Sequence, residues 1–302
     1  MNKMINNPEQ VAYVRRYTLN GGASDGIKVV EVYNGVLRLL LNESKALDIM
    51  QMFHQGTNIS YLSKNTFTKR ETDFMSRFEG GMLYTCGVDV VGDQTGYENH
   101  GSLHNMPALV TRCECNEKEI IVEATIRNTE LFGRNLVLRR RYETKVCSGT
   151  VTLCDELSNE GWRDENYSML YHVNVGYPML DDETVLIADV AEIVPRNEWS
   201  QANIATALVS ETPQDGREET CYYLNLNKSS VSLVNKHLAK KFTLSYNGEE
   251  LPHFIEWKSM ASGDYALGLE PSTTRLGSEF SFSTLKAQKK ISFRLSFDMQ
   301  CI

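Results

Sequence analysis

The chain has 302 residues, of which 41% are apolar and 23% are charged, and its net charge is −8. This composition is ordinary for a globular protein, so we expect a hydrophobic core and no extended disorder. The acidic excess argues against nucleic-acid binding, which needs a dense basic stripe. No run of 18 apolar residues occurs, so we expect no membrane-spanning helix.

The cysteines and the N-terminus bear on localisation. Seven cysteines are present without any C-x-x-C pair, a pattern that indicates neither a zinc knuckle nor a redox pair. The opening residues MNKMINNPEQ lack the apolar segment of a secretory signal. We therefore expect a reduced, cytoplasmic protein.

Alternating apolar and polar residues dominate the first part of the chain. Residues 8–16 predict a short helix or an entry strand. Residues 27–43, IKVVEVYNGVLRLLLNE, hold two alternating runs around Asn34 and Gly35. This pattern predicts a β-hairpin with a type I′ turn, which needs positive φ at both central residues.

The same alternation continues through the rest of the chain. Residues 119–128, 135–145 and 151–160 predict three strands at roughly ten-residue intervals, and residues 289–300 predict another. Residues 211–220, ETPQDGREET, are polar and rich in turn formers, so we expect a surface loop. No alternation of strands with helices appears. The prediction is one all-β domain over residues 1–302, a large antiparallel β-sandwich or barrel.

A short basic run, Arg139 to Arg141, lies within one predicted strand. Alternation would place Arg139 and Arg141 on one face and Arg140 on the other. This arrangement favours a solvated edge or ion pairs within a sheet over a nucleic-acid site.

Two of the six histidines, His100 and His104, fall in the stretch ENHGSLHN. Its composition indicates loop or strand, and Gly101 occupies the position that the catalytic Glu holds in the zinc motif H-E-x-x-H. We therefore predict no metal site. Packing and ligand binding remain as alternative roles for the two histidines.

Two nearby segments suggest a ligand site. Arg77 precedes the glycine pair in RFEGGMLYTCG, and its planar fork suits a polar ligand oxygen, although a surface ion pair is the alternative. In LYHVNVGYPML, alternation places His172 and Asn174 on one strand face, as a hydrogen-bonding pair or as structural residues.

The motif GLEPST places Glu270 at the end of an apolar run. Partial desolvation there would raise its pKa toward the range of a general base. The alternative is an ordinary glutamate in water at a strand end.

Together, these motifs resemble the galactose mutarotase (aldose 1-epimerase) superfamily, and more closely a divergent epimerase-like branch of it. The resemblance covers nearly the whole chain, and the motifs occur in the expected order: YVRRYTLNGGASDGIKVVEVYNGVLRLLLN, RFEGGMLYTCG, ENHGSLHNMPA, LYHVNVGYPML and GLEPST. It implies a galactose mutarotase-like β-sandwich with an open cleft and a few short helices.

The resemblance also implies roles for individual residues. Glu270 would be the general base and His172 the general acid, while His100 and Arg77 would bind the sugar. His104 and Asn174 are further candidates for sugar binding. The chain departs from the family pattern at three positions, Ser102, Tyr171 and Lys45, which bear on sugar specificity and activity.

The implied activity is interconversion of the α and β anomers of a monosaccharide, with no cofactor and with a homodimer as a candidate assembly. One alternative is a carbohydrate-binding protein without turnover, for which aromatic platforms are available. The candidates are Tyr84, Tyr97, Tyr171, Trp199 and Trp257. Another alternative is an epimerase of phosphorylated or acidic sugars, with extra cations from among Arg112, Arg139, Arg141 and Lys258.

Overall fold

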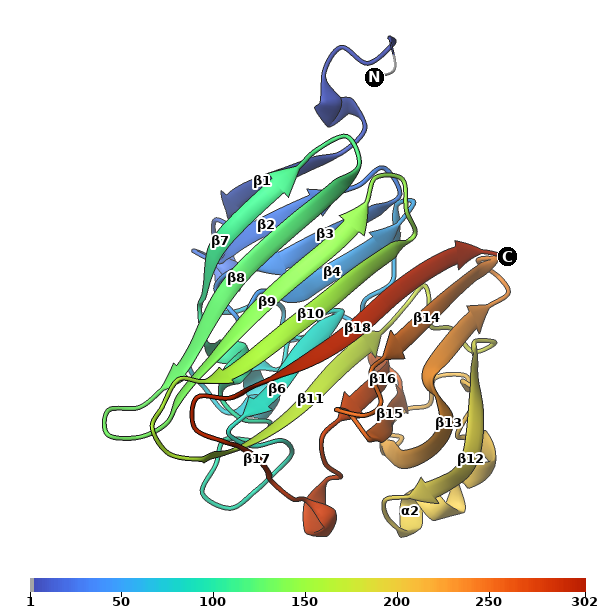
Figure 1. Cartoon of the computed structure of the whole chain (residues 1–302). Coiled ribbons are helices and arrows are strands. Elements are labelled where there is room, and N and C mark those ends of the chain that lie inside the picture. The colour runs from blue at the N-terminus through green and yellow to red at the C-terminus, as the bar shows by residue number, and fades with distance from the viewer. Residues whose placement is uncertain (1–2) are drawn as a thin grey trace.

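The computed structural model describes residues 3–302 and contains two antiparallel sheets (Figure 1). The smaller sheet has five strands, which lie side by side in chain order. They are β1 (Tyr13–Thr18), β2 (Lys28–Tyr33), β3 (Leu37–Asn42), β4 (Asp48–His54) and β5 (Thr57–Asn58).

The larger sheet has 13 strands, and its main path runs β17-β11-β16-β15-β13-β14-β18-β10-β9-β8-β7. Two further strands join it, because β6 pairs with β11 and β12 pairs with β13. The bounds are β6 (Leu83–Val88), β7 (Ala108–Cys115), β8 (Glu119–Thr129), β9 (Asn135–Lys145), β10 (Thr150–Asn159), β11 (Glu165–Val175), β12 (Val185–Pro195), β13 (Thr220–Asn235), β14 (Lys240–Tyr246), β15 (His253–Ala261), β16 (Asp264–Ser272), β17 (Ser283–Leu285) and β18 (Lys290–Cys301).

Helices are short throughout the described residues. The two α-helices are α1 (Phe74–Arg77) and α2 (Glu198–Ala202). Single 3₁₀ turns occur at Pro8–Gln10, Gly22–Ser24, Leu103–Asn105, Ile204–Thr206 and Gly277–Glu279. The prediction of an all-β, antiparallel β-sandwich with a few short helices is therefore confirmed. Within residues 3–302, no helix is long and apolar enough to cross a membrane.

The predicted strands form because their apolar residues recur at every second position. In β18, Phe293, Leu295 and Phe297 are buried while Ser292 and Arg294 are exposed. The buried faces of the two sheets meet in one hydrophobic cluster, to which strands of both sheets contribute. The segment 8–16 combines both alternatives, since a 3₁₀ turn is followed by the entry strand β1.

The hairpin between β2 and β3 is present, but its turn is not type I′. Gly35 has a φ of 96°, whereas Asn34 keeps an ordinary negative φ. The Asn34 side chain explains the difference, because its Oδ1 accepts the amides of Val36 and Leu37. Its Nδ2 donates to the Thr144 hydroxyl at 2.7 Å, so the turn is tied to the larger sheet.

A buried ion-pair network connects the two sheets. Arg140 on β9 is 1% exposed and donates to both oxygens of Asp155 on β10, at 3.0 and 2.7 Å. The same guanidinium pairs with Asp48 on β4 of the smaller sheet. Its neighbours Arg139 and Arg141 are half-exposed and pair with glutamates, so the predicted alternation is confirmed. Sequence patterning did not indicate that Arg140 would be fully buried.

Candidate active site

His172 and Glu270 come together on one face of the larger sheet, from the adjacent strands β11 and β16. Val173 is the register partner of Leu269 in this antiparallel pair. His172, one residue before Val173, therefore lies beside Glu270, one residue after Leu269. The His172 Nε2 and Glu270 Oε1 atoms are 3.1 Å apart. Both side chains are nearly inaccessible, with exposures of 5% for His172 and 1% for Glu270.

Gly268 makes this arrangement possible. A Cβ atom at this position would lie 2.6 Å from Glu270 Oε1 and 2.9 Å from His172 Cε1. The absence of a side chain therefore leaves the space that the two functional groups occupy. The glycine two residues before Glu270 in GLEPST is thus explained by the lack of space for a side chain.

His100 approaches the pair from the loop after β6. Its ring centroid lies 5.8 Å from that of His172, in an edge-to-face arrangement. His100 itself has a φ of 63°, a conformation that non-glycine residues adopt mainly where the surroundings enforce it. Gly101 follows with a φ of 76°, and a Cβ there would lie 2.4 Å from the Val90 carbonyl oxygen. The backbone path therefore requires glycine at position 101.

Ser102 anchors the same loop. Its hydroxyl donates to Asp89 at 2.9 Å and accepts from Asn128 at 2.8 Å. The departure from the family pattern at this position is thus accommodated by hydrogen bonds to Asp89 and Asn128. The loop carries His100 at its inner end.

These three side chains border a cleft of about 490 Å³. Aromatic rings surround the two histidines: the Phe78 and Trp257 rings lie 5.7 and 5.6 Å from the His172 ring, and the Phe74 ring lies 5.0 Å from the His100 ring. The lining residues are Tyr61, Lys64, Asn65, Phe74, Met75, Phe78, Gly92, Asp93, Asn99, His100, His172, Arg196, Arg217, Glu219, Cys221, Trp257, Ser259, Ala261, Asp264, Glu270 and Leu276. Trp257 is the one predicted aromatic platform among them.

Burial controls the protonation of the three groups. It lowers the pKa of His172 to about 3 and that of His100 to about 4, and Arg196 contributes to the shift at His100 through its charge. Burial, and then the negative charge of Glu219, raises the pKa of Glu270 well above its usual range. Burial therefore favours the uncharged forms of both histidines and of Glu270.

Two buried polar atoms of the pair are not hydrogen-bonded. Glu270 Oε1 and His172 Nδ1 have no hydrogen-bond partner among the described residues, and the 3.1 Å contact does not have hydrogen-bond geometry. Buried polar atoms are normally satisfied, so exceptions require an explanation. A polar ligand in the adjoining cleft would supply the missing partners.

Asn174 supports the site rather than lining it. Its side-chain amide donates to the His172 carbonyl oxygen at 3.1 Å, and it is fully buried. The predicted pairing of His172 and Asn174 on one strand face is present. Asn174 therefore contacts the backbone of His172 and is not among the residues that line the cleft.

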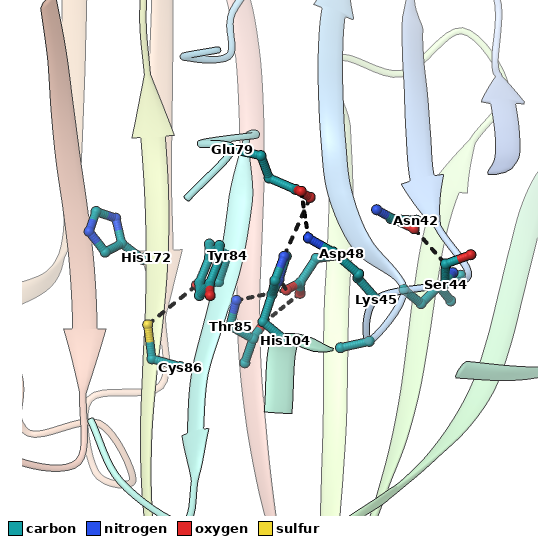
Figure 2. A network of polar contacts seen from close by, with 12 residues as sticks. Asn42, Ser44, Lys45, Asp48, Glu79, Tyr84, Thr85, Cys86, His104 and His172 are labelled. Carbon is teal, nitrogen blue, oxygen red and sulfur yellow. Dashed lines mark hydrogen bonds and ion pairs between the residues drawn. The ribbon is translucent and has the colours of Figure 1, made fainter. Parts of the chain in front are cut away.

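His104 does not lie in the cleft. Figure 2 shows it beyond Tyr84 from His172, and its ring stacks on Tyr84 with centroids 3.6 Å apart. Its Nδ1 lies 2.6 Å from Asp48, and Nε2 lies 3.4 Å from Glu79, which in turn pairs with Lys45 at 2.6 Å. The expectation that His104 binds sugar does not fit this position, because its ring is enclosed between buried acids.

Arg77 is also held away from the cleft. It is the last residue of α1. Phe74 at the start of this helix and Phe78 just after it line the cleft, while the Arg77 guanidinium donates to the Thr72 carbonyl oxygen and pairs with Glu98. Arg77 therefore links α1 to the segment that leads to His100, and it is not among the residues that line the cleft.

The cations that sequence reasoning proposed for an acidic sugar lie elsewhere. Arg112, Arg139 and Arg141 are on strands β7 and β9 in ion pairs with glutamates, and Lys258 is buried against the carbonyls of Thr206 and Val209. Arg196, Arg217 and Glu219 line the cleft instead. Arg217 and Glu219 belong to the polar segment 211–220, which the sequence predicted only as a surface loop. The sequence pattern gave no sign that Arg196 would line the cleft.

No group of three or more His, Cys, Asp or Glu side chains in the described part of the chain is placed to hold a metal ion. The cleft combines acid–base and hydrogen-bonding side chains with several aromatic rings. Such a combination suits a small polar molecule with apolar faces.

Several solved structures are similar to this chain. Among solved structures, a candidate aldose 1-epimerase from Klebsiella pneumoniae is 19% identical, with a TM-score of 0.85 over 95% of this chain and 83% of that one. A galactose mutarotase-like protein from Clostridium acetobutylicum is 14% identical, with a TM-score of 0.69 over 97% and 100%. A candidate mutarotase from Salmonella typhimurium is 11% identical, with a TM-score of 0.70 over 99% and 96%.

At these identities the likeness shows the fold, and the fold expected from the resemblance is confirmed. A search of curated proteins found no match. The family model described as Domain of unknown function (DUF4432) matches residues 24–290. The chain belongs to the DUF4432 family and has the galactose mutarotase-like fold.

Proposed function

We propose that the protein is an isomerase of the aldose 1-epimerase type, which interconverts the α and β anomers of a monosaccharide. The observation that carries this proposal is the Glu270–His172 pair, whose Oε1 and Nε2 atoms are 3.1 Å apart at the wall of the cleft. The names of the similar solved structures support the same reaction class.

The reaction requires two proton transfers. A base takes the proton of the anomeric hydroxyl, the C1–O5 bond breaks as C1 becomes an aldehyde, and an acid protonates O5. Rotation about C1–C2 and ring closure by the reverse transfers give the other anomer. We assign the base to Glu270 and the acid to His172.

This assignment needs Glu270 as carboxylate and His172 as imidazolium when the cyclic sugar is bound. Transfer of one proton from Glu270 to His172 produces that state from the uncharged pair. Ring opening returns the proton to Glu270 and leaves His172 neutral. Burial, which favours the uncharged forms of both groups, therefore favours the protonation state that accompanies the open-chain sugar.

The surrounding groups would position the sugar. The Gly92 amide donates to His100 Nδ1 at 3.4 Å, which leaves the ring proton on Nε2 as a donor for a hydroxyl or the ring oxygen. Trp257 and Phe78 would pack on the apolar face of the ring. No cofactor takes part in this scheme.

The test is the rate of anomer exchange, measured by polarimetry or NMR with a panel of aldoses. Glu270→Gln removes the base and should lower kcat by about 10²–10⁴-fold, the usual contribution of a general acid or base. Glu249→Gln makes the same change at an exposed position outside the cleft and should leave the rate unchanged.

The alternative is a carbohydrate-binding protein without turnover. Such a protein would bind aldoses saturably and leave anomer exchange at its spontaneous rate. If Glu270→Gln and the parent protein accelerate exchange equally, the assignment of the base is wrong.

A further inference from the structure

We infer that Glu219 is a positioning residue of the candidate active site and acts by fixing the Trp257 ring against His172. This inference rests on the proposed function, because positioning has meaning only for a reaction at the Glu270–His172 pair. Glu219 lies just before β13 and Trp257 lies on β15, and both side chains line the cleft.

The register of the larger sheet brings the two side chains together. Cys221 on β13 pairs with Trp257 in antiparallel register. Glu219 precedes Cys221 by two residues, so its side chain lies on the same face, diagonal to Trp257. The Trp257 indole Nε1 donates to Glu219 Oε2 at 2.6 Å. A hydrogen bond to a carboxylate is stronger than one between neutral groups.

Trp257 also contacts the proposed reaction centre. The ring centroids of Trp257 and His172 are 5.6 Å apart, with an angle of 67° between the ring planes. Trp257 pairs across the sheet with Gly268, the glycine that leaves room for Glu270 and His172. One hydrogen bond and one ring contact therefore connect Glu219 to His172.

The Trp257 ring needs an anchor because it is only partly buried and borders the open cleft. An indole N–H takes a hydrogen-bond partner when it leaves water. Within residues 3–302, Glu219 is the acceptor that Trp257 Nε1 finds. The hydrogen bond thereby selects the orientation in which the ring packs beside His172.

Glu219 also acts on Glu270 through its charge. After burial, this negative charge is the largest cause that raises the pKa of Glu270, because it disfavours the carboxylate, while Arg196 acts in the opposite sense. Burial favours the uncharged forms of the other titratable groups around Glu270. In the described part of the chain these are His172 on β11, His100 on the loop after β6, Cys86 on β6 and Cys221 on β13.

The charge of Glu219 has a consequence for the pH dependence of the reaction. In the proposed scheme the Glu270–His172 pair holds one proton, and loss of that proton at high pH removes the acid. A negative charge nearby keeps the proton on the pair to a higher pH. Glu219 therefore extends the alkaline side of the active pH range.

Two substitutions separate the anchor from the charge. Glu219→Gln keeps an oxygen that accepts the Trp257 N–H but carries no charge, whereas Glu219→Ala removes both. The kinetic experiment follows anomer exchange by NMR as a function of pH, with the aldose that the parent protein exchanges fastest. We expect Glu219→Ala to lower kcat/KM at its optimum by about 2- to 10-fold, the usual range for one lost hydrogen bond, and Glu219→Gln to restore most of it.

The alkaline limb of the kcat/KM profile should move to lower pH in both variants, because both lack the charge. Glu218→Gln is the matched control, since Glu218 is the exposed neighbour outside the cleft lining, and it should leave the profile unchanged. A Glu219→Ala protein with the parent's kcat/KM and alkaline limb would overturn the inference.

Fluorescence separates this inference from the proposed function. Trp162→Phe and Trp199→Phe together leave Trp257 as the only tryptophan in the sequence. In that background we expect Glu219→Ala, but not Glu219→Gln, to increase quenching of the emission by acrylamide, because the ring is released into the cleft. If no sugar exchanges faster in the parent protein, the proposed function fails, while this increase still supports the anchor. Equal quenching in all three proteins overturns it.

Discussion

Gly268 determines how Glu270 and His172 can meet. The two side chains lean over a position without a Cβ, and any side chain there would enter their space. The backbone of Gly268 does not have the positive φ that would itself demand glycine. Glycine is therefore needed at position 268 to leave room for the Glu270 and His172 side chains, and not because the backbone conformation demands it.

Gly268→Ala should consequently impair activity more than stability. The added methyl group would displace Glu270 Oε1 and His172 Cε1, and misplacement of reacting groups by about 1 Å can reduce the rate on the order of 10²-fold. Anomer exchange measures the loss, and thermal unfolding provides the control. Full activity in a folded Gly268→Ala protein would contradict the geometry described for the pair.

The helix α1 forms one wall of the cleft although it has only four residues. Asp73 caps it by accepting the Ser76 amide at 3.1 Å, and Phe74 and Phe78 then face His100 and His172. A helix this short has little intrinsic stability, so its cap and its packing must hold it. The ion pair between Arg77 and Glu98 ties it to the loop that ends at His100.

Asp73→Ala should loosen this wall, whereas Asp73→Asn should preserve it, because asparagine is an equally good N-cap. Loss of a cap costs about 0.5–2 kcal/mol, so we expect KM to rise and the Ser76 amide to exchange faster. Kinetics and amide hydrogen exchange measure the two effects. Identical behaviour of the alanine and asparagine variants would show that the cap does not order the wall.

The two sheets are joined by charge as well as by apolar packing. Arg140 lies between Asp155 on the larger sheet and Asp48 on the smaller one, and Asp48 also contacts His104 and Thr85 (Figure 2). Buried charges are tolerated only when they are paired, so these residues depend on one another. The network thereby sets how the smaller sheet sits against β6 and β9.

Arg140→Met should destabilise the protein by about 3–5 kcal/mol, because it leaves Asp48 and Asp155 buried without their partner. Arg141→Met, one residue along the same strand, removes a half-exposed ion pair and should cost less than about 1 kcal/mol. Urea unfolding measures both values. Equal losses in the two variants would show that the inter-sheet network contributes no more than the surface pairs.

Alternation along the chain was enough to predict the strands, the hairpin at Asn34 and Gly35, and the opposite faces of Arg139 and Arg140. These features depend on neighbours within a few residues, which is the range over which backbone geometry and burial impose a period of two. The resemblance to a known family added the pairing of His172 with Glu270. Their local motifs alone left structural roles open for both.

Only the tertiary structure decided which side chains share the cleft. Arg77 and His104 have suitable chemistry but point into ion pairs elsewhere, while Arg196 and Glu219 lie in segments with no distinctive pattern. The reason is that the register between strands far apart in sequence, and the orientation of the short helix α1, determine which side chains line the cleft. Those quantities are set by long-range packing of the two sheets, which no local window of residues contains.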